Sequence, residues 1–181
     1  FCPVSLKYTV KAEILKHTNC DDIYVFDDRT EADNLPRSRW YVVGIESLSS
    51  SNRVVFAALG LVTADTFVIL DESSYIKGHK AIRTMRITQM CKEARYRLLL
   101  TGTPLSQGVV DLFAQMRFLS PKILGYNSFY SFAANHLEYS EKYPDMIVRA
   151  HNTQLLAEKI KPYVYQVTKS ECLSLPNKCY G

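Results

Sequence analysis

The chain has 181 residues, 47% of them apolar and 22% charged, with a formal net charge of +4 at pH 7. These values are ordinary for one compact globular domain, and a chain of this length buries roughly 70% of its unfolded surface on folding. No run of eighteen apolar residues is present, which argues against a membrane span. The five cysteines lack C-x-x-C spacing, so neither a zinc site nor a disulfide framework is indicated.

Short apolar runs alternate with helical patterns along the whole chain. Helices are predicted over 6–16, 52–59, 79–94, 109–119 and 153–160, and strands over 23–26, 40–45, 66–70, 96–100 and 163–168. In the third helix, Ile82, Met85 and Gln89 are expected near one face. This alternation predicts an α/β fold with a three-layer parallel sheet. A Tyr- and Phe-rich stretch at about 122–150 is less regular, and we expect a helical insertion there.

Two adjacent carboxylates, Asp71 and Glu72, follow the apolar run Thr66–Leu70. Ligands bind beyond the carboxyl ends of strands in open α/β sheets. An Asp at such a place can hold a metal ion that bridges phosphate oxygens, and the next Glu can orient or deprotonate water. The pattern is therefore a Walker-B arrangement of a nucleotide hydrolase. The alternative is a strand that simply ends in a solvated acidic turn.

A second apolar strand, Tyr96–Leu100, runs directly into the sequence Thr-Gly-Thr-Pro-Leu at 101–105. Hydroxyls, a glycine and a proline after a buried strand favour a tight turn. We expect strands ending at Phe26, Ile45, Leu70 and Leu100 to lie parallel in one sheet. In that arrangement Asp71 and Thr101 lie side by side at the carboxyl edge.

Residues 71–77 and 99–105 resemble motifs II and III of the Snf2-type, superfamily 2 helicase-like ATPases. Further segments resemble other parts of that family in the right order. These are 2–6 for motif Ia, 41–48 for the motif Ib region, 111–121 for the helix after motif III, and 163–178 for the close of the first lobe. The resemblance covers nearly the whole chain. It implies the first RecA-like lobe of a P-loop NTPase, in a DNA-dependent ATPase that binds ATP and Mg²⁺ between two lobes and moves along duplex DNA.

The resemblance also implies roles for individual residues. Asp71 would hold Mg²⁺, and Glu72 would activate water. Residues that would link nucleotide state to the DNA side are Ser74, Thr101, Gly102, Thr103 and Gln107. Residues that would contact nucleic acid are Pro3, Ser5, Lys7, Ser47 and Lys77.

Two of these positions depart from the family pattern, and several have simpler explanations. Ser74 stands where the family often has His, and Gln107 where Asn is frequent. Thr101 and Thr103 could instead cap the turn, and Gln107 could be a surface amide. Lys77 belongs to a basic stretch that could equally be a solvated helix face.

No G-x-x-x-x-G-K-[ST] phosphate loop occurs in the sequence. The resemblance places that loop upstream of motif Ia and an arginine finger in a second lobe. It thus implies that residues 1–181 are a partial first lobe that is inactive alone and works with the second RecA-like lobe of the same full-length protein. Two alternatives stay open: a strand-separating superfamily 2 helicase of a restriction-type system, and a non-catalytic remnant that binds DNA or a partner. Such a protein would be nuclear in a eukaryote and cytoplasmic in a bacterium or phage host.

Overall fold

Parallel strand pairs form the centre of the molecule. The computed structural model describes residues 1–105 and 108–167. Strand β1 (Ile23–Val25) pairs in parallel with β2 (Trp40–Val42), and β3 (Phe67–Leu70) pairs in parallel with β4 (Tyr96–Leu99). The four corresponding strand predictions are confirmed, each strand being slightly shorter than the predicted run.

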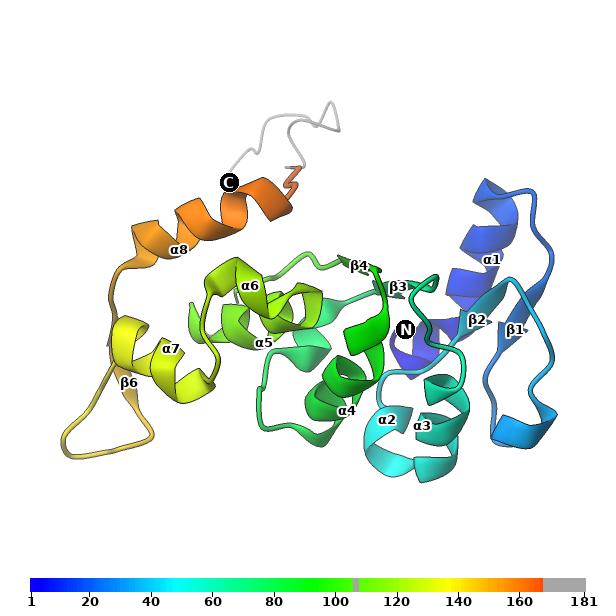
Figure 1. Ribbon diagram of the computed structural model, residues 1–181, viewed down its shortest axis with the longest axis horizontal. Helices are drawn as coiled ribbons and strands as arrows, with labels where there is room; N and C mark the ends of the chain where they lie inside the picture. Colours follow the sequence, from blue (N-terminus) through cyan, green and yellow to red (C-terminus); the bar gives the residue numbers. More distant parts are fainter. Residues whose placement is uncertain (106–107, 168–181) are drawn as a thin grey trace, which may run out of the picture.

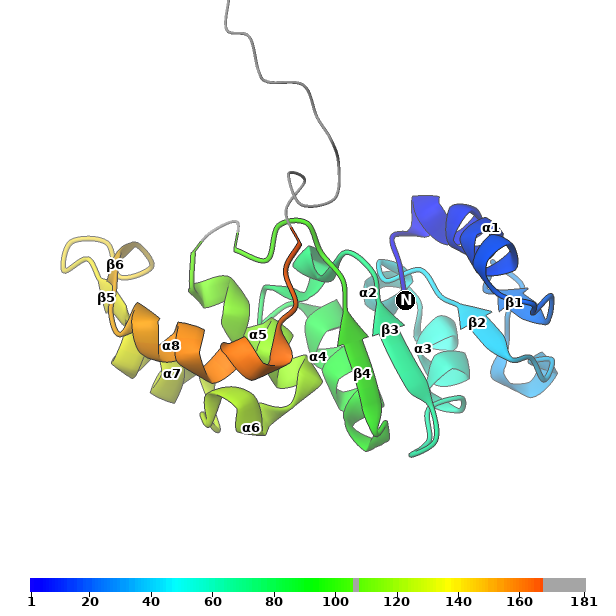
Figure 2. The same ribbon diagram turned by 90° about the horizontal axis from the view of Figure 1, so that it is seen from above.

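Phe1 and Cys2 lie between the two pairs, beside β2 on one side and β3 on the other (Figure 2). Their backbone bonds are those of a parallel ladder: Phe1 N to Ile69 O at 2.7 Å, Asp71 N to Phe1 O at 2.8 Å, Cys2 N to Val43 O at 3.1 Å and Ile45 N to Cys2 O at 2.9 Å. The expectation of one continuous four-stranded sheet is wrong. The strands form separate two-stranded sheets. In the space between β2 and β3, only Phe1 and Cys2 of the described residues bond to the two sides, and two residues are too few to join the pairs into one sheet.

Helices alternate with the strands along the chain. They are α1 (Lys7–His17), α2 (Ser47–Ser50), α3 (Asn52–Leu59), α4 (Ile82–Met90), α5 (Val110–Leu119), α6 (Pro121–Leu124), α7 (Phe129–His136) and α8 (Thr153–Ile160). Ser51 caps α3 by accepting a hydrogen bond from the Val54 amide, as its residue type favours. None of the helices in the described part of the chain has the length and apolarity needed to cross a bilayer.

Both faces of the β1–β2 pair are covered, which gives three layers there. Ile23 and Val42 pack with Val10 and Ile14 of α1. Phe26 on the opposite face joins the main core, where α2, α3 and α4 pack against β3. The described residues cover one face of the β3–β4 pair and leave the other face open. On its other face Phe67, Tyr96 and Leu98 are exposed and line an open hollow of about 430 Å³ together with Arg95 and Arg97.

Ile82, Met85 and Gln89 lie on one face of α4, as expected, and this face points away from the core. Ile82 and Met85 are 52% and 53% exposed, and Gln89 is exposed as well. The buried residues are Thr84, Ile87 and Met90, which lie three apart on one face. The helix begins at Ile82, not at His79, and its neighbours α2 and α5 cover the side that carries Ile87.

The strand predicted over 163–168 is not formed in its described residues. Tyr163 ends a 3-10 turn, η5 (Lys161–Tyr163), that contains Pro162. Residues 164–167 belong to no helix or strand. Tyr165 is 91% exposed, so the apolar content of this stretch does not reflect burial in a sheet. Thr168 lies outside the described residues.

The aromatic-rich stretch at 122–150 is only partly helical. Helices α6 and α7 form its first part, and strands β5 (Leu137–Tyr139) and β6 (Ile147–Ala150) then make an antiparallel hairpin that the sequence analysis did not predict. The hairpin and α7 lie at one end of the elongated molecule, and α1 and β1 lie at the other (Figures 1 and 2).

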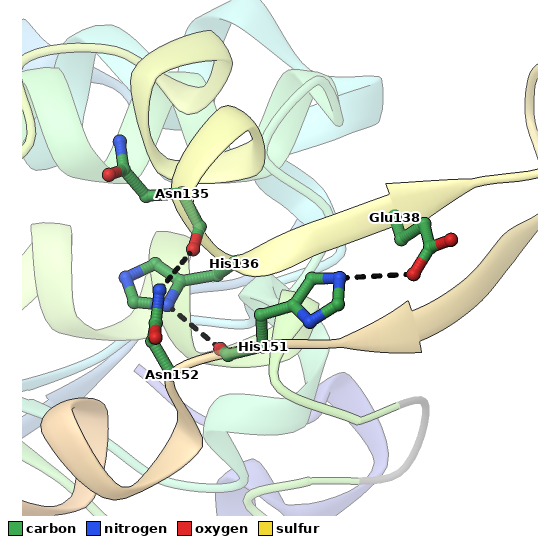
Figure 3. Close-up of polar contacts among 5 residues, drawn as sticks. All are labelled: Asn135, His136, Glu138, His151 and Asn152. Atoms are coloured by element: carbon green, nitrogen blue, oxygen red, sulfur yellow. Dashed lines mark hydrogen bonds and ion pairs between the residues drawn. The ribbon is translucent and has the colours of Figure 1, made fainter.

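Polar contacts attach the hairpin to α7 and to the start of α8 (Figure 3). The His136 ring is fully buried, with Nδ1 3.1 Å from the His151 carbonyl oxygen and Nε2 2.8 Å from the Tyr126 hydroxyl. Because a carbonyl only accepts, Nδ1 carries the hydrogen and Nε2 accepts from Tyr126. The Asn152 amide donates to the Asn135 carbonyl at 3.0 Å, and His151 pairs with Glu138 at 3.0 Å. These contacts fix where α8 begins.

The two faces of α4 give a test of this packing. Ile87→Ala should lower the free energy of unfolding by about 2–5 kcal/mol, because it leaves a cavity in the main core. Met85→Ala on the exposed face should change it by no more than about 0.5 kcal/mol. Urea unfolding of both variants measures the difference. Equal destabilisation by the two changes would show that the helix is turned otherwise.

Candidate active site

The turns that follow β3 and β4 meet at the carboxyl edge of this pair. Leu70 lies opposite Leu99, and the ladder continues past the strands, since the Leu100 amide donates to the Leu70 carbonyl at 2.9 Å. The Ser73 amide then donates to the Leu100 carbonyl, also at 2.9 Å. The predicted closeness of the carboxylate turn and the Thr101 turn is therefore confirmed.

Glu72 is held by hydroxyl and amide donors from both turns. The Thr101 hydroxyl donates to Glu72 Oε1 at 2.9 Å. Hydrogen bonds from the Ser74 hydroxyl, then the Thr101 hydroxyl and the Ser74 amide, lower the pKa of Glu72, while its partial burial acts in the opposite direction. The carboxylate is thus ionised at neutral pH. Ser74 contacts Glu72 directly, so this serine has a defined place in the site.

The backbone of Glu72 is left-handed, with φ +52° and ψ +65°. Such a conformation costs roughly 1–2 kcal/mol for a residue with a Cβ. Hydrogen bonds hold the peptide on each side: before the Glu72 Cα, the Glu72 amide donates to Asp71 Oδ1 at 3.0 Å. After it, the Ser73 amide donates to the Leu100 carbonyl and the Glu72 carbonyl accepts from the Tyr75 amide at 3.1 Å. Backbone strain of this kind concentrates at functional sites.

Asp71 lies half-buried at the end of β3, and its backbone amide is bonded to the Phe1 carbonyl. Its Oδ1 accepts the Glu72 amide at 3.0 Å, which orients the carboxyl group. Mg²⁺ in nucleotide-hydrolysing sites takes one or two carboxylates and completes its shell with water and phosphate oxygens. A fixed carboxylate next to an ionised Glu72 and hydroxyl groups fits that donor set.

The other predicted residues of the second turn are less enclosed. The Thr103 amide donates to the Thr101 hydroxyl oxygen at 3.1 Å, so Thr101 links both Thr103 and Glu72. Gly102 is exposed, and a Cβ placed on it meets no described atom within 4 Å. Gln107 lies outside the described residues.

Sequence reasoning missed two buried residues that join the turns, Ser73 and Gln115. The Ser73 hydroxyl donates to Gln115 Oε1 at 2.5 Å, and Gln115 Nε2 donates to the Pro104 carbonyl at 2.9 Å. The sequence carries one signal for this contact. Gln115 is a neutral amide inside the largely apolar pattern of α5, and a buried amide needs hydrogen-bond partners.

Three of the predicted nucleic-acid residues lie in neighbouring segments. Residues 3–5 run beside Gly44 and the start of α2, because the Val4 amide donates to Glu46 Oε2 at 2.8 Å. A Cβ on Gly44 would come within 2.5 Å of the Val4 side chain, so glycine permits this approach. The structure thus brings Pro3 and Ser5 near Ser47. Pro3 is buried, Ser5 exposed and Ser47 half-buried.

The predicted basic contacts are partly engaged within the chain. Lys7 donates its ammonium group to the Phe26 carbonyl at 2.6 Å. Lys77 is half-buried directly after the 3-10 turn η3 (Ser73–Ile76). From the same basic stretch, Arg86 donates to the Leu48 carbonyl and Arg97 to the Phe118 carbonyl. Those two guanidinium groups serve the packing of the core.

Comparison with known families agrees with this geometry. The sequence matches the SNF2-related domain over residues 2–180. The chain belongs to the SNF2-related family. It is 30% identical over 183 residues to the human "DNA annealing helicase and endonuclease ZRANB3", covering 97% of this chain and 17% of that protein. It is 32% identical over 120 residues to the Arabidopsis thaliana "TATA-binding protein-associated factor BTAF1", covering 62% of this chain and 6% of that protein.

A solved structure confirms the RecA-like α/β fold of this SNF2-related chain. The Sulfolobus solfataricus SWI2/SNF2 ATPase core in complex with dsDNA superposes with a TM-score of 0.74 at 22% identity. The match covers 97% of this chain and 35% of that one. The chain therefore spans a minor part of the length of the proteins that it resembles.

Substitutions at Glu72 test the backbone strain separately from the carboxylate. Glu72→Gly and Glu72→Ala both remove the side-chain bonds, but only glycine accepts a positive φ without strain. We expect the free energy of unfolding of the Gly variant to be about 1 kcal/mol higher than that of the Ala variant. Glycine removes the strain of the left-handed backbone, but part of this gain is lost because glycine has more entropy in the unfolded state. Urea unfolding compares the two. An Ala variant as stable as the Gly variant would mean that residue 72 is not held left-handed.

Proposed function

We propose that this chain is the part of an ATP-dependent DNA translocase that carries the catalytic carboxylates and part of the DNA-contacting surface. One observation carries the proposal: the strained, ionised Glu72 accepts a hydrogen bond from Thr101 where two parallel strands end. Membership of the SNF2-related family supports it. A plain acidic turn would need neither the strain nor the cross-strand bond.

In the proposed reaction each carboxylate has a separate task. Asp71 would hold Mg²⁺, which when bound neutralises charge on the phosphate oxygens. Glu72 would orient the attacking water and accept its proton, for which an ionised carboxylate is required. The Ser74 and Thr101 hydroxyls keep Glu72 charged and in place.

The second turn would pass the nucleotide state to the DNA side. Thr101 is bonded to Glu72 and to the Thr103 amide, so a change at the carboxylate moves the turn that contains Gly102. Gln107 follows in the same segment. Hydroxyl and amide groups suit phosphate contacts that carry no base preference. On this basis Ser5 and Ser47 would contact the backbone of duplex DNA through their hydroxyls, and Lys7 and Lys77 through their ammonium groups, while the buried Pro3 would shape the segment that carries Ser5. This would take place in the nucleus of a eukaryote or the cytoplasm of a bacterium.

The reaction needs groups that residues 1–181 do not contain. The sequence has no G-x-x-x-x-G-K-[ST] loop for the phosphates. An arginine from a second lobe would stabilise the transition state, and such a residue is worth about 10³–10⁵ in rate. The isolated chain would therefore not turn over ATP. A strand-separating helicase would use the same carboxylates, so strand-displacement assays distinguish it from a translocase.

Glu72→Gln in the full-length protein tests the proposal. It should lower DNA-stimulated ATP hydrolysis by about 10²–10⁴-fold while nucleotide binding stays near the wild-type level, because the amide keeps the shape but cannot accept the proton. Steady-state hydrolysis and binding of a fluorescent nucleotide give the two values. Glu141→Gln, the same change at an exposed residue of the hairpin loop, serves as the control. Wild-type hydrolysis by Glu72→Gln would contradict the assignment.

Asp71→Asn should have a different effect in the same protein. It removes a ligand charge, so binding of Mg²⁺-nucleotide should weaken and the Mg²⁺ concentration needed for half-maximal binding should rise. Titration of Mg²⁺ at fixed nucleotide measures this. An unchanged Mg²⁺ requirement would remove Asp71 from the metal site.

A further inference from the structure

Gln115 lies in the middle of α5 with only 2% of its surface exposed. Leu112, Phe113, Ala114 and Met116 around it are also buried. An amide in such surroundings is unfavourable unless all its hydrogen-bonding groups find partners. A leucine or methionine would fill the same place without that requirement. The presence of an amide therefore indicates a polar task at this position.

Both polar atoms of the Gln115 side chain are hydrogen-bonded. Its Oε1 accepts the Ser73 hydroxyl at 2.5 Å. Its Nε2 donates to the Pro104 carbonyl at 2.9 Å and to the Asp111 carbonyl at 2.9 Å. The bond to Asp111 lies within α5 and fixes the rotamer. The other two bonds leave the helix in different directions.

Those two partners belong to the two turns of the candidate active site. Ser73 is the fully buried neighbour of Glu72, and its amide is bonded to Leu100. Pro104 closes the turn that begins with Thr101. The Gln115 side chain thus binds the turn after β3 through its oxygen, which accepts from Ser73, and the turn after β4 through its nitrogen, which donates to Pro104. A displacement of either turn relative to α5 would stretch the bond between Thr101 and Glu72.

We propose that Gln115 is a positioning residue that keeps Glu72 and Thr101 in register for the hydrolysis proposed above. Gln115 is enclosed by protein, with 2% of its surface exposed. It acts by fixing two turns on one rigid helix, and this requires a group that donates and accepts at once. Misplacement of a catalytic group by about 1 Å can lower a rate by about 10²-fold, so the effect on turnover should be large.

Gln115→Met in the full-length protein removes both bonds and keeps a side chain of similar length. Because the turn moves but the phosphate contacts do not, kcat for DNA-stimulated ATP hydrolysis should fall by about 10-fold to 100-fold, with KM for ATP changed less than about twofold. Leu112→Ala is the matched control on the same helix. It loses packing in the cluster around Phe132, so its urea midpoint should fall while its kcat stays at the wild-type value.

The double variant Ser73→Ala/Gln115→Met separates positioning from simple stability. Removing both partners leaves no unpaired hydroxyl at Ser73, so the urea midpoint should return toward wild type, whereas kcat should stay low. A kcat that recovers together with the midpoint would overturn the inference. It would also be overturned by a wild-type kcat in Gln115→Met. If Gln115→Met does not fold, the double variant alone decides.

Glu72→Gln in the same assay distinguishes failure of the inference from failure of the proposed function. Loss of hydrolysis in Glu72→Gln with a wild-type rate in Gln115→Met would reject only the role of Gln115. Wild-type hydrolysis in Glu72→Gln would reject the proposed function, whatever Gln115→Met shows.

Discussion

The parallel pairing of β3 and β4 is the constraint on which the candidate site depends. Because the two strands are parallel, their carboxyl ends lie together, and residues 29 positions apart in the sequence become neighbours. The backbone bonds from Leu100 to Leu70 and from Ser73 to Leu100 extend this pairing into the turns. The left-handed backbone of Glu72 lies between two bonded peptides, since the Ser73 amide is bonded to Leu100 and the Glu72 amide to Asp71 Oδ1. The geometry of the candidate site is thus a direct consequence of the strand pairing.

Much of the fold could be predicted from local patterns, because strands and helices of this size have strong periodic signals. The run 66–70 and the cap at Ser51 are local features, and the structure contains both. Which face of α4 is buried could not be predicted. Ile82 and Met85 are as apolar as Ile87, and only the neighbouring helices decide which of them is buried. The apolar residues at 163–167 predicted a strand for the same reason, yet no partner strand reaches them in the described chain. The β5–β6 hairpin depends on contacts of His136 and Asn152 with residues distant in sequence.

Some residues of the candidate site could also be predicted from the sequence, and others could not. Asp71, Glu72 and Thr101 were predictable because residue type and position after a strand point to their chemistry, and the structure brings them together. The contact between Ser74 and Glu72 was not predictable from the family pattern, which favours a larger side chain there. Ser73 and Gln115 were missed because their importance lies in a buried contact across 42 positions of sequence. Sequence reasoning thus finds groups that do chemistry more readily than groups that hold them in place.

The central claim is that Glu72 and Thr101 act as one unit in hydrolysis. A double-mutant cycle on single-turnover ATP hydrolysis by the full-length protein tests it most directly, with Glu72→Gln, Thr101→Val and the combined variant. The account predicts a coupling free energy of about 1–3 kcal/mol, so that Thr101→Val slows the wild-type protein strongly but barely changes Glu72→Gln. Additive effects, with a coupling near zero, would contradict the claim and leave the bond between these residues without a catalytic role.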